Sequence, residues 1–105
     1  MDKKLEALEE KYASLAERLE STAIMSDMAA YAKCMKEYKA LTPIIDKYHE
    51  YKPALADLGD AEEIAAETDD AEMRSLAQEQ AAQSRASIDR CLGELKVLLL
   101  PRDPN

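Results

Sequence analysis

The sequence predicts an all-α fold, an elongated antiparallel bundle of three long helices, with or without a short fourth helix in a connection, packed as in a coiled coil. Composition is the first observation behind this prediction, since the 105 residues include only two Gly and no Phe or Trp. Ala, Glu, Leu, Lys, Asp and Gln dominate, and most of these side chains lose little freedom in a helix. The second observation is that apolar residues recur at heptad spacing. Strand-favouring residues are scarce.

The first helix is predicted over residues 2 to 20. Spacings of three and four place its apolar residues on one face. These residues are Leu5, Leu8, Tyr12, Leu15 and Leu19. The pattern lapses over residues 21 to 26, which predicts a turn. Ser26 or Asp27 can begin the next helix, because either side chain accepts hydrogen bonds from first-turn amides.

The second helix carries two interleaved apolar lines, which form a seam of a and d positions. One line is Tyr31, Tyr38 and Ile45, and the other is Cys34, Leu41, Tyr48 and Leu55. At Pro43, either Thr42 caps a fresh helix or one long helix kinks, and the uninterrupted register favours the kinked helix. A helix end or second bend is expected near Pro53. Gly59 and Asp60 are the expected stop.

The last long helix is expected from about residue 70 to Leu99, after at most a short helical piece over residues 61 to 67. Asp69 followed by Glu72 resembles a capping box at its start. Its heptad lines are Ala81, Ile88 and Leu95, and Ala77, Ser84, Cys91 and Leu98. Small side chains occupy the first half and large ones the second. We therefore expect tight helix packing over residues 77 to 84 and a thicker bundle near Leu95.

Cys34 and Cys91 lie on these predicted seams, which favours reduced thiols in the core over a disulfide or a reactive thiol. No stretch approaches the roughly 20 apolar residues of a membrane span. The start also lacks the apolar core of a signal peptide. These features predict a soluble protein of the cytoplasm.

The formal net charge of -8 is concentrated in one segment. Residues 53 to 73 include eight acids and no Lys or Arg, whereas the flanking parts are nearly neutral. Nucleic-acid phosphates would be repelled by such a segment, so direct nucleic-acid binding is disfavoured. Two alternatives stay open, a solvated connection without a partner and a surface that attracts a basic protein.

The inventory of chemically active residues supports no catalytic, cofactor-binding or metal-binding site. His49 is the one histidine, and the residue three before it is Asp46 rather than the Glu of a di-metal bundle. No glycine-rich phosphate loop or nucleophile elbow is present. Tyr12, Tyr31, Tyr38 and Tyr48 lie on seams and are expected in the core. Tyr51 lies off the main seam and is the aromatic residue to test for contact with a partner.

Four segments carry a resemblance to a known family. They are KLEALEEKY at 4–12, PIIDKYHEYK at 43–52, DAEMRSLA at 70–77 and LKVLLLPRDPN at 95–105. In this order they resemble the N-terminal helical domain of the bacterial peptide chain release factor 1 family, the class-1 translation termination factors. The resemblance covers essentially the whole chain, and its most specific part is the leucine-rich ending. It implies an N-terminal helical domain over residues 1–100, with residues 101–105 beginning a linker to further domains.

The resemblance implies a role in termination at UAA and UAG codons. Such factors read the codon with a Pro-x-Thr tripeptide and trigger peptidyl-tRNA hydrolysis with a Gly-Gly-Gln loop, and neither motif occurs in this sequence. The resemblance therefore implies a noncatalytic part that does not itself read the codon. The absence of a long apolar stretch predicts no membrane partner. The implied partners are the stalk-base region of the ribosome and the release-factor GTPase. The alternative is a free-standing helical bundle that forms homodimers through its heptads.

Overall fold

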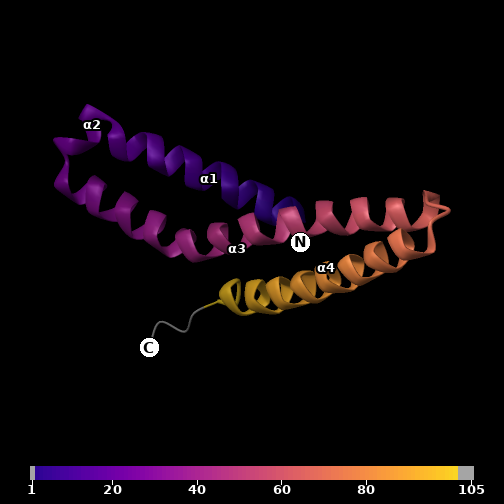
Figure 1. Ribbon diagram of the computed structural model, residues 1–105. Helices are drawn as coiled ribbons and strands as arrows, with labels where there is room; N and C mark the ends of the chain where they lie inside the picture. Colours follow the sequence, from indigo (N-terminus) through magenta and orange to yellow (C-terminus); the bar gives the residue numbers. More distant parts are fainter. Residues whose placement is uncertain (1, 102–105) are drawn as a thin grey trace. The chain divides into compact units, whose positions relative to one another are not determined.

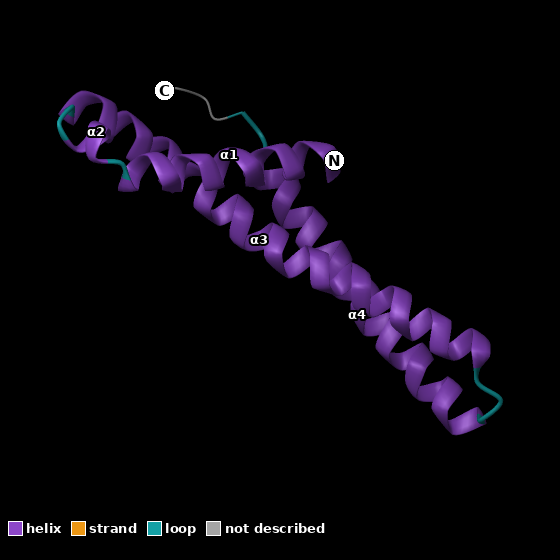
Figure 2. Ribbon diagram, turned by 90° about the horizontal axis from the view of Figure 1, so that it is seen from above, coloured by secondary structure: helices purple, strands orange, loops and turns teal. Residues whose placement is uncertain are grey.

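The computed structural model describes residues 2–101 and places four helices along them (Figure 1). These are α1 (Asp2–Glu20), α2 (Thr22–Met25), α3 (Met28–Glu67) and α4 (Ala71–Leu98). No strand occurs among the described residues, which confirms the all-α prediction of three long helices and a short fourth one (Figure 2). The position of the short helix differs from the prediction, because α2 lies where a turn was expected and residues 61–67 belong to α3. The chain divides into two compact units, Met1–Asp46 and Lys47–Asn105, and α3 contributes to both.

The first unit is a helical hairpin in which α1 and the beginning of α3 run antiparallel, joined through α2 (Figure 1). Its core contains Leu15, Ile24 and Cys34, with other apolar side chains packed around them. Those surrounding residues are Leu19, Ala30, Tyr31, Tyr38 and Leu41. The Cys34 thiol lies 3.7 Å from the Leu15 carbonyl oxygen, to which it donates. The structure therefore confirms that Leu15, on the predicted apolar face of the first helix, is a core residue.

Two tyrosines join the helices of this hairpin. The rings of Tyr12 and Tyr38 are stacked with their centroids 4.3 Å apart. The Thr42 hydroxyl donates to the Tyr38 carbonyl at 2.9 Å, so the Tyr12 hydroxyl, 3.0 Å away, is the donor to Thr42. The pKa of Tyr38 is raised, chiefly because its phenol donates a hydrogen bond to Tyr12 and also because it is partly desolvated. These contacts confirm that Tyr12 and Tyr38 support the core.

Side-chain caps define the connection between α1 and α3. Ser21 caps α2 by accepting from the Ala23 amide at 3.2 Å. Asp27 accepts from the Ala30 amide at 3.1 Å and thereby satisfies a free donor at the start of α3. Of the two predicted caps, Asp27 is thus the one that begins the long helix, whereas the Ser26 hydroxyl donates to the Ala23 carbonyl.

The helix α3 is continuous over 40 residues and includes Pro43, Pro53 and Gly59. The alternative in which Thr42 caps a fresh helix is therefore wrong, and the single-helix alternative is confirmed. A helix end at Pro53 and a stop at Gly59 and Asp60 are wrong as well. Each proline removes one amide donor, but the flanking turns bury apolar side chains, and this tertiary packing outweighs local propensity. Gly59 has no positive φ and acts as an ordinary helical residue.

In the second unit, the later part of α3 and all of α4 form an antiparallel hairpin (Figures 1 and 2). The buried residues of α4 follow the predicted heptad lines. They are Ala77, Ala81, Ile88, Cys91 and Leu95. Alanines come first and larger side chains follow, which confirms the predicted division of the last helix into small and large halves. Cys91, like Cys34, is a buried free thiol, as predicted.

The seam of α3 departs from the predicted register after Tyr48. Tyr51 is only 7% exposed and Ala54 is buried, whereas Leu55 is 39% exposed. The prediction that Tyr51 is available to a partner is therefore wrong, and so is the placement of Leu55 in the core. The buried residues Tyr48, Tyr51 and Ala54 follow one another at spacings of three. The buried position is therefore Ala54, one residue before the position that the heptad predicts. A heptad extrapolated from the first hairpin cannot anticipate this shift, because α3 pairs with α4 in the second.

The connection between α3 and α4 consists of residues 68–70. Asp70, rather than the predicted Asp69, is the N-cap, and its carboxylate accepts from the Glu72 amide at 2.9 Å. The Thr68 hydroxyl accepts from the Asp70 amide, and its carbonyl oxygen accepts from the Arg74 guanidinium at 2.9 Å. The local hydrogen bonds of Thr68 move the cap one residue along the chain.

No helix within residues 2–101 is long and apolar enough to cross a membrane. The predicted linker begins at Pro101, and residues 102–105 lie outside the described part of the chain.

Candidate functional site

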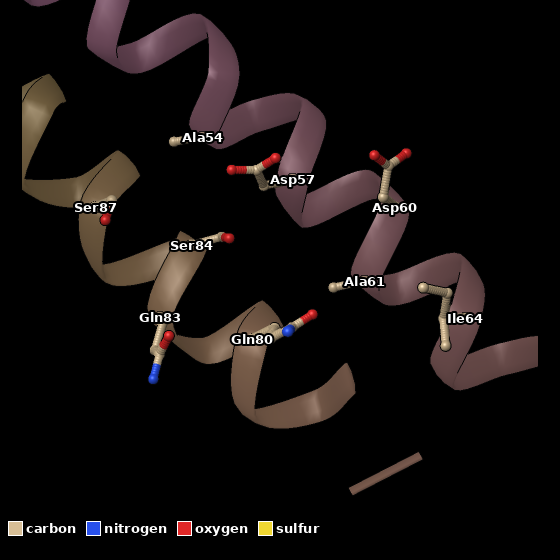
Figure 3. A pocket seen from close by; sticks show the side chains of 9 residues that line it. All are labelled: Ala54, Asp57, Asp60, Ala61, Ile64, Gln80, Gln83, Ser84 and Ser87. Atoms are coloured by element: carbon tan, nitrogen blue, oxygen red, sulfur yellow. The ribbon is translucent and has the colours of Figure 1, made fainter. Parts of the chain in front are cut away.

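A polar groove of about 510 Å³ lies between α3 and α4 in the second unit (Figure 3). Its lining residues are Ala54, Asp57, Asp60, Ala61 and Ile64 from α3, and Gln80, Gln83, Ser84 and Ser87 from α4. The groove occupies the part of the hairpin where α4 has its small side chains. The sequence therefore dictates its position through the same residues that predict tight packing.

Small side chains explain why the groove exists. Ala61, Ala77 and Ala81 are buried along the seam and leave little apolar bulk beside it. Ser84 and Ser87 from α4, with Ala54 from α3, add no large group to fill the flank (Figure 3). Close helix contact along the seam thus coexists with an open surface beside it.

The chemistry of the groove is that of hydrogen bonding with an excess of negative charge. Asp57 and Asp60 provide carboxylates, Gln80 and Gln83 provide amides, and the two serines provide hydroxyls. No Lys or Arg belongs to its lining. Ile64 contributes an apolar side chain at one end (Figure 3). A cationic or amide-rich ligand is therefore the kind of group that this lining favours.

The opposite flank of the hairpin is electrostatically different. A smaller hollow of about 340 Å³ there is lined by Glu62, Ala65, Ala66, Gln78, Ala81 and Arg85. Arg85 of α4 contacts the Glu62 carboxylate of α3 at 3.0 Å. This ion pair compensates an acid of the 53–73 segment. The polar groove has no such cation in its lining, so its negative charge is exposed to a partner.

At the other end of the same hairpin, Lys47 links α3 to α4. Its ammonium group lies 2.6 Å from Glu50 on α3 and 2.5 Å from Glu94 on α4. The hydrogen bonds that Lys47 donates to Glu50 and Glu94 raise the pKa of Lys47. The pKa of Glu50 is lowered, first by its hydrogen bond with Lys47 and then by the charge of the same lysine. Lys47 therefore links the two helices and has no free role in the groove.

The single histidine of the sequence lies at the surface of α3. His49 is exposed, as predicted for a surface histidine, and its ring lies 6.5 Å from that of Tyr48. Among the described residues, no three His, Cys, Asp or Glu side chains are placed to hold a metal ion. Sequence reasoning missed the groove. The sequence signal that could have revealed the groove is the pair Asp57 and Asp60. These acids lie about one turn apart on a helix that faces small and amide side chains.

The described residues define an all-α protein of two helical hairpins, with a polar groove in the second hairpin. The sequence model of one family, the PCRF domain, matches residues 8–105. The chain belongs to the PCRF domain family.

The curated relatives that match the chain are peptide chain release factors. The chain is 39% identical over its whole length to peptide chain release factor 1 of Clostridioides difficile (strain 630), covering 30% of that protein. It is 43% identical over 97% of its length to peptide chain release factor 1 of Alkaliphilus oremlandii (strain OhILAs), covering 29% of that protein. No solved structure matches the chain. The chain thus spans about 30% of the length of these relatives.

Proposed function

We propose that this chain is the N-terminal, noncatalytic helical domain of a translation termination factor that releases the nascent peptide at UAA and UAG codons. The observation that carries the proposal is the match along the whole chain, combined with coverage of only 30% of a peptide chain release factor 1. In this proposal residues 1–100 are the domain and residues 101–105 begin the linker. The Gly-Gly-Gln and Pro-x-Thr segments belong to the remaining part of the factor.

The chemistry of the chain supports a noncatalytic role. The groove between α3 and α4 offers carboxylates, amides and hydroxyls, but no histidine or cysteine belongs to its lining. A hydroxyl nucleophile needs an adjacent base held within hydrogen-bonding distance, and no hydrogen bond joins Ser84 or Ser87 to a carboxylate in the described part of the chain. Peptidyl-tRNA hydrolysis is therefore assigned to the part of the factor outside this chain.

The proposed role of the domain is to bind other components of the termination machinery. We assign the domain to a cytoplasmic factor that binds the ribosome near the stalk base and the release-factor GTPase that recycles it. The acidic segment 53–73 repels phosphate groups, so this domain does not read the codon or any other nucleotide sequence. Its contacts are expected with proteins.

Cosedimentation with ribosomes tests the proposal. The 105-residue chain and the complete factor are each mixed with ribosomes paused at a UAA codon and with ribosomes paused at a sense codon. The complete factor should prefer the stop codon, whereas the isolated chain should bind both ribosomes equally and without peptide release. Absence of binding by the chain, together with a stable concentration-dependent dimer in sedimentation, would favour the free-standing homodimer instead.

A further inference from the structure

Three large apolar side chains are exposed around the hairpin connection of the second unit. Ile64 of α3 is 43% exposed, and Met73 and Leu76 of α4 are 51% and 61% exposed. Ile64 lines the groove itself. Leu76 precedes the groove residues Gln80 and Gln83 by four and seven positions, so it lies on the same face of α4.

Met73 extends this stripe by one more turn, since it precedes Leu76 by three positions and Gln80 by seven. We call the groove lining together with Met73 and Leu76 the groove face. It combines an apolar end near the connection with a polar, acidic trough. Apolar side chains gathered beside a groove are a mark of a protein interaction site.

Acidic residues dominate the charge around the groove face, and Arg74, whose guanidinium donates to the Thr68 carbonyl, is the basic residue beside Met73. Asp57 and Asp60 lie in the groove, and the other six acids of the 53–73 segment are exposed along the same stretch of the hairpin, with Glu62 on its opposite flank. Arg85 compensates Glu62 on the opposite flank. A negative field over exposed apolar side chains selects a partner that is both basic and amphipathic.

We propose that the groove face docks a basic amphipathic helix of a partner protein. The apolar stripe of that helix covers Ile64, Met73 and Leu76, and its Lys or Arg side chains reach Asp57 and Asp60. This inference rests on the proposed function in one respect, that the partner belongs to the termination machinery. Helix-in-groove docking of this kind uses apolar anchors spaced at three, four and seven positions.

Charge argues against a second copy of this chain and against a nucleic acid as the occupant of the groove face. A second copy of this chain would bring another -8 and the same acidic segment to the interface. A nucleic acid would bring phosphates to Asp57 and Asp60, which repel them. A basic protein helix relieves the negative field and covers the apolar side chains together.

Fluorescence anisotropy with the 105-residue chain tests the proposal. The probe is a labelled 18-residue amphipathic helix of Leu and Lys. The comparison probes are a scrambled peptide of the same composition, a Leu and Glu helix, and a single-stranded RNA. The amphipathic Lys helix should bind about tenfold or more tighter than each comparison probe, and its affinity should fall as salt rises.

Variants locate the binding. Leu76→Ser should weaken binding of the Lys helix about tenfold, in the range of an interface anchor. Asp57→Asn with Asp60→Asn should reduce both the affinity and its salt dependence. Val97→Ser and Asp89→Asn are matched controls, because both residues are exposed and neither belongs to the groove face. Both should bind as the parent does.

Equal binding of the scrambled peptide, tighter binding of the RNA, or groove-face variants that bind as the controls do would each overturn the proposal. The ribosome experiment separates this failure from failure of the proposed function. If Leu76→Ser binds ribosomes as well as the parent chain does, the groove face is not the contact and the termination role stands. If the chain binds the Lys helix but no ribosome, the docking face stands and the termination role fails.

Discussion

The two ends of the α3–α4 hairpin are built from side chains of different size. Near the connection the seam consists of Ala61, Ala77 and Ala81, all nearly fully buried. At the other end Ile88, Cys91 and Leu95 fill the seam, and Leu95 has no exposed surface. One pair of helices thus has an end with little apolar bulk and an end with much of it.

This difference separates stability from recognition. Large buried side chains contribute most of the burial free energy, so the Leu95 end should hold the hairpin together. The alanine end contributes less, yet its small side chains leave the groove and the exposed apolar residues beside it. The comparison predicts that substitutions in the core of the Leu95 end change stability most. Substitutions on the surface of the alanine end should change binding instead.

The largest expected effect is at Leu95. Leu95→Ala should lower the free energy of unfolding by about 2 to 5 kcal/mol, because it removes buried contacts and leaves a cavity. Urea denaturation followed by circular dichroism measures it. Val97→Ala is the matched control, since Val97 is 68% exposed, and it should change stability by under about 0.5 kcal/mol. Equal losses for the two variants would contradict the proposed role of this end.

A smaller loss is expected at Ala81. Ala81→Leu should destabilise the chain by about 1 to 3 kcal/mol, since the added carbons overpack the tight seam. Ala82→Leu places the same side chain at an exposed position and should be nearly neutral. Thermal melts of the two variants make the comparison. An unchanged melting temperature for Ala81→Leu would mean that the alanine end is not tightly packed.

Gly59→Ala should stabilise the chain by about 1 kcal/mol, the usual difference between Gly and Ala inside a helix. A Cβ at Gly59 would meet nothing within 4 Å. Gly93, near the other end of the hairpin, has the same open surroundings, so Gly93→Ala should give a similar gain. Denaturant midpoints of both variants test this, and a loss at position 59 alone would argue against a regular helix through that residue.

The smallest effect concerns Lys47 and depends on pH. Because the pKa of Glu50 is lowered by Lys47, their contact stabilises the fold at neutral pH and is lost as pH falls through that lowered pKa. Lys47→Met should therefore reduce the melting temperature slightly at pH 7 and not at pH values well below the ordinary Glu pKa of about 4.3. The exposed Lys96→Met is the control. A pH-independent difference would assign the effect to packing.

Sequence periodicity predicted the parts of the fold that depend on one repeated contact. The seams of α1 and α4 follow the heptad, and the buried thiols of Cys34 and Cys91 follow from it. It failed for α3 after Tyr48, where the buried line shifts to Tyr51 and Ala54. That shift depends on which helix lies opposite, and a periodic pattern within one helix does not contain this information.

Local signals failed where tertiary packing opposes them. Pro53 and Gly59 predicted ends that the continuous α3 does not have, because burial on neighbouring turns outweighs a cost of a few kcal/mol. The groove was missed for a related reason. Its acids and small residues come from segments more than 20 positions apart, such as Asp57 and Ser84, and only the hairpin brings them together.

Hydrogen exchange with and without ribosomes tests the division between the two ends most directly. We expect ribosomes to add protection to amides of residues 54–64 and 73–87, which carry the groove face. Residues 88–95 should show slow exchange in the free chain and gain little. Added protection confined to residues 2–46 or to residues 88–98 would contradict the assignment of recognition to the alanine end.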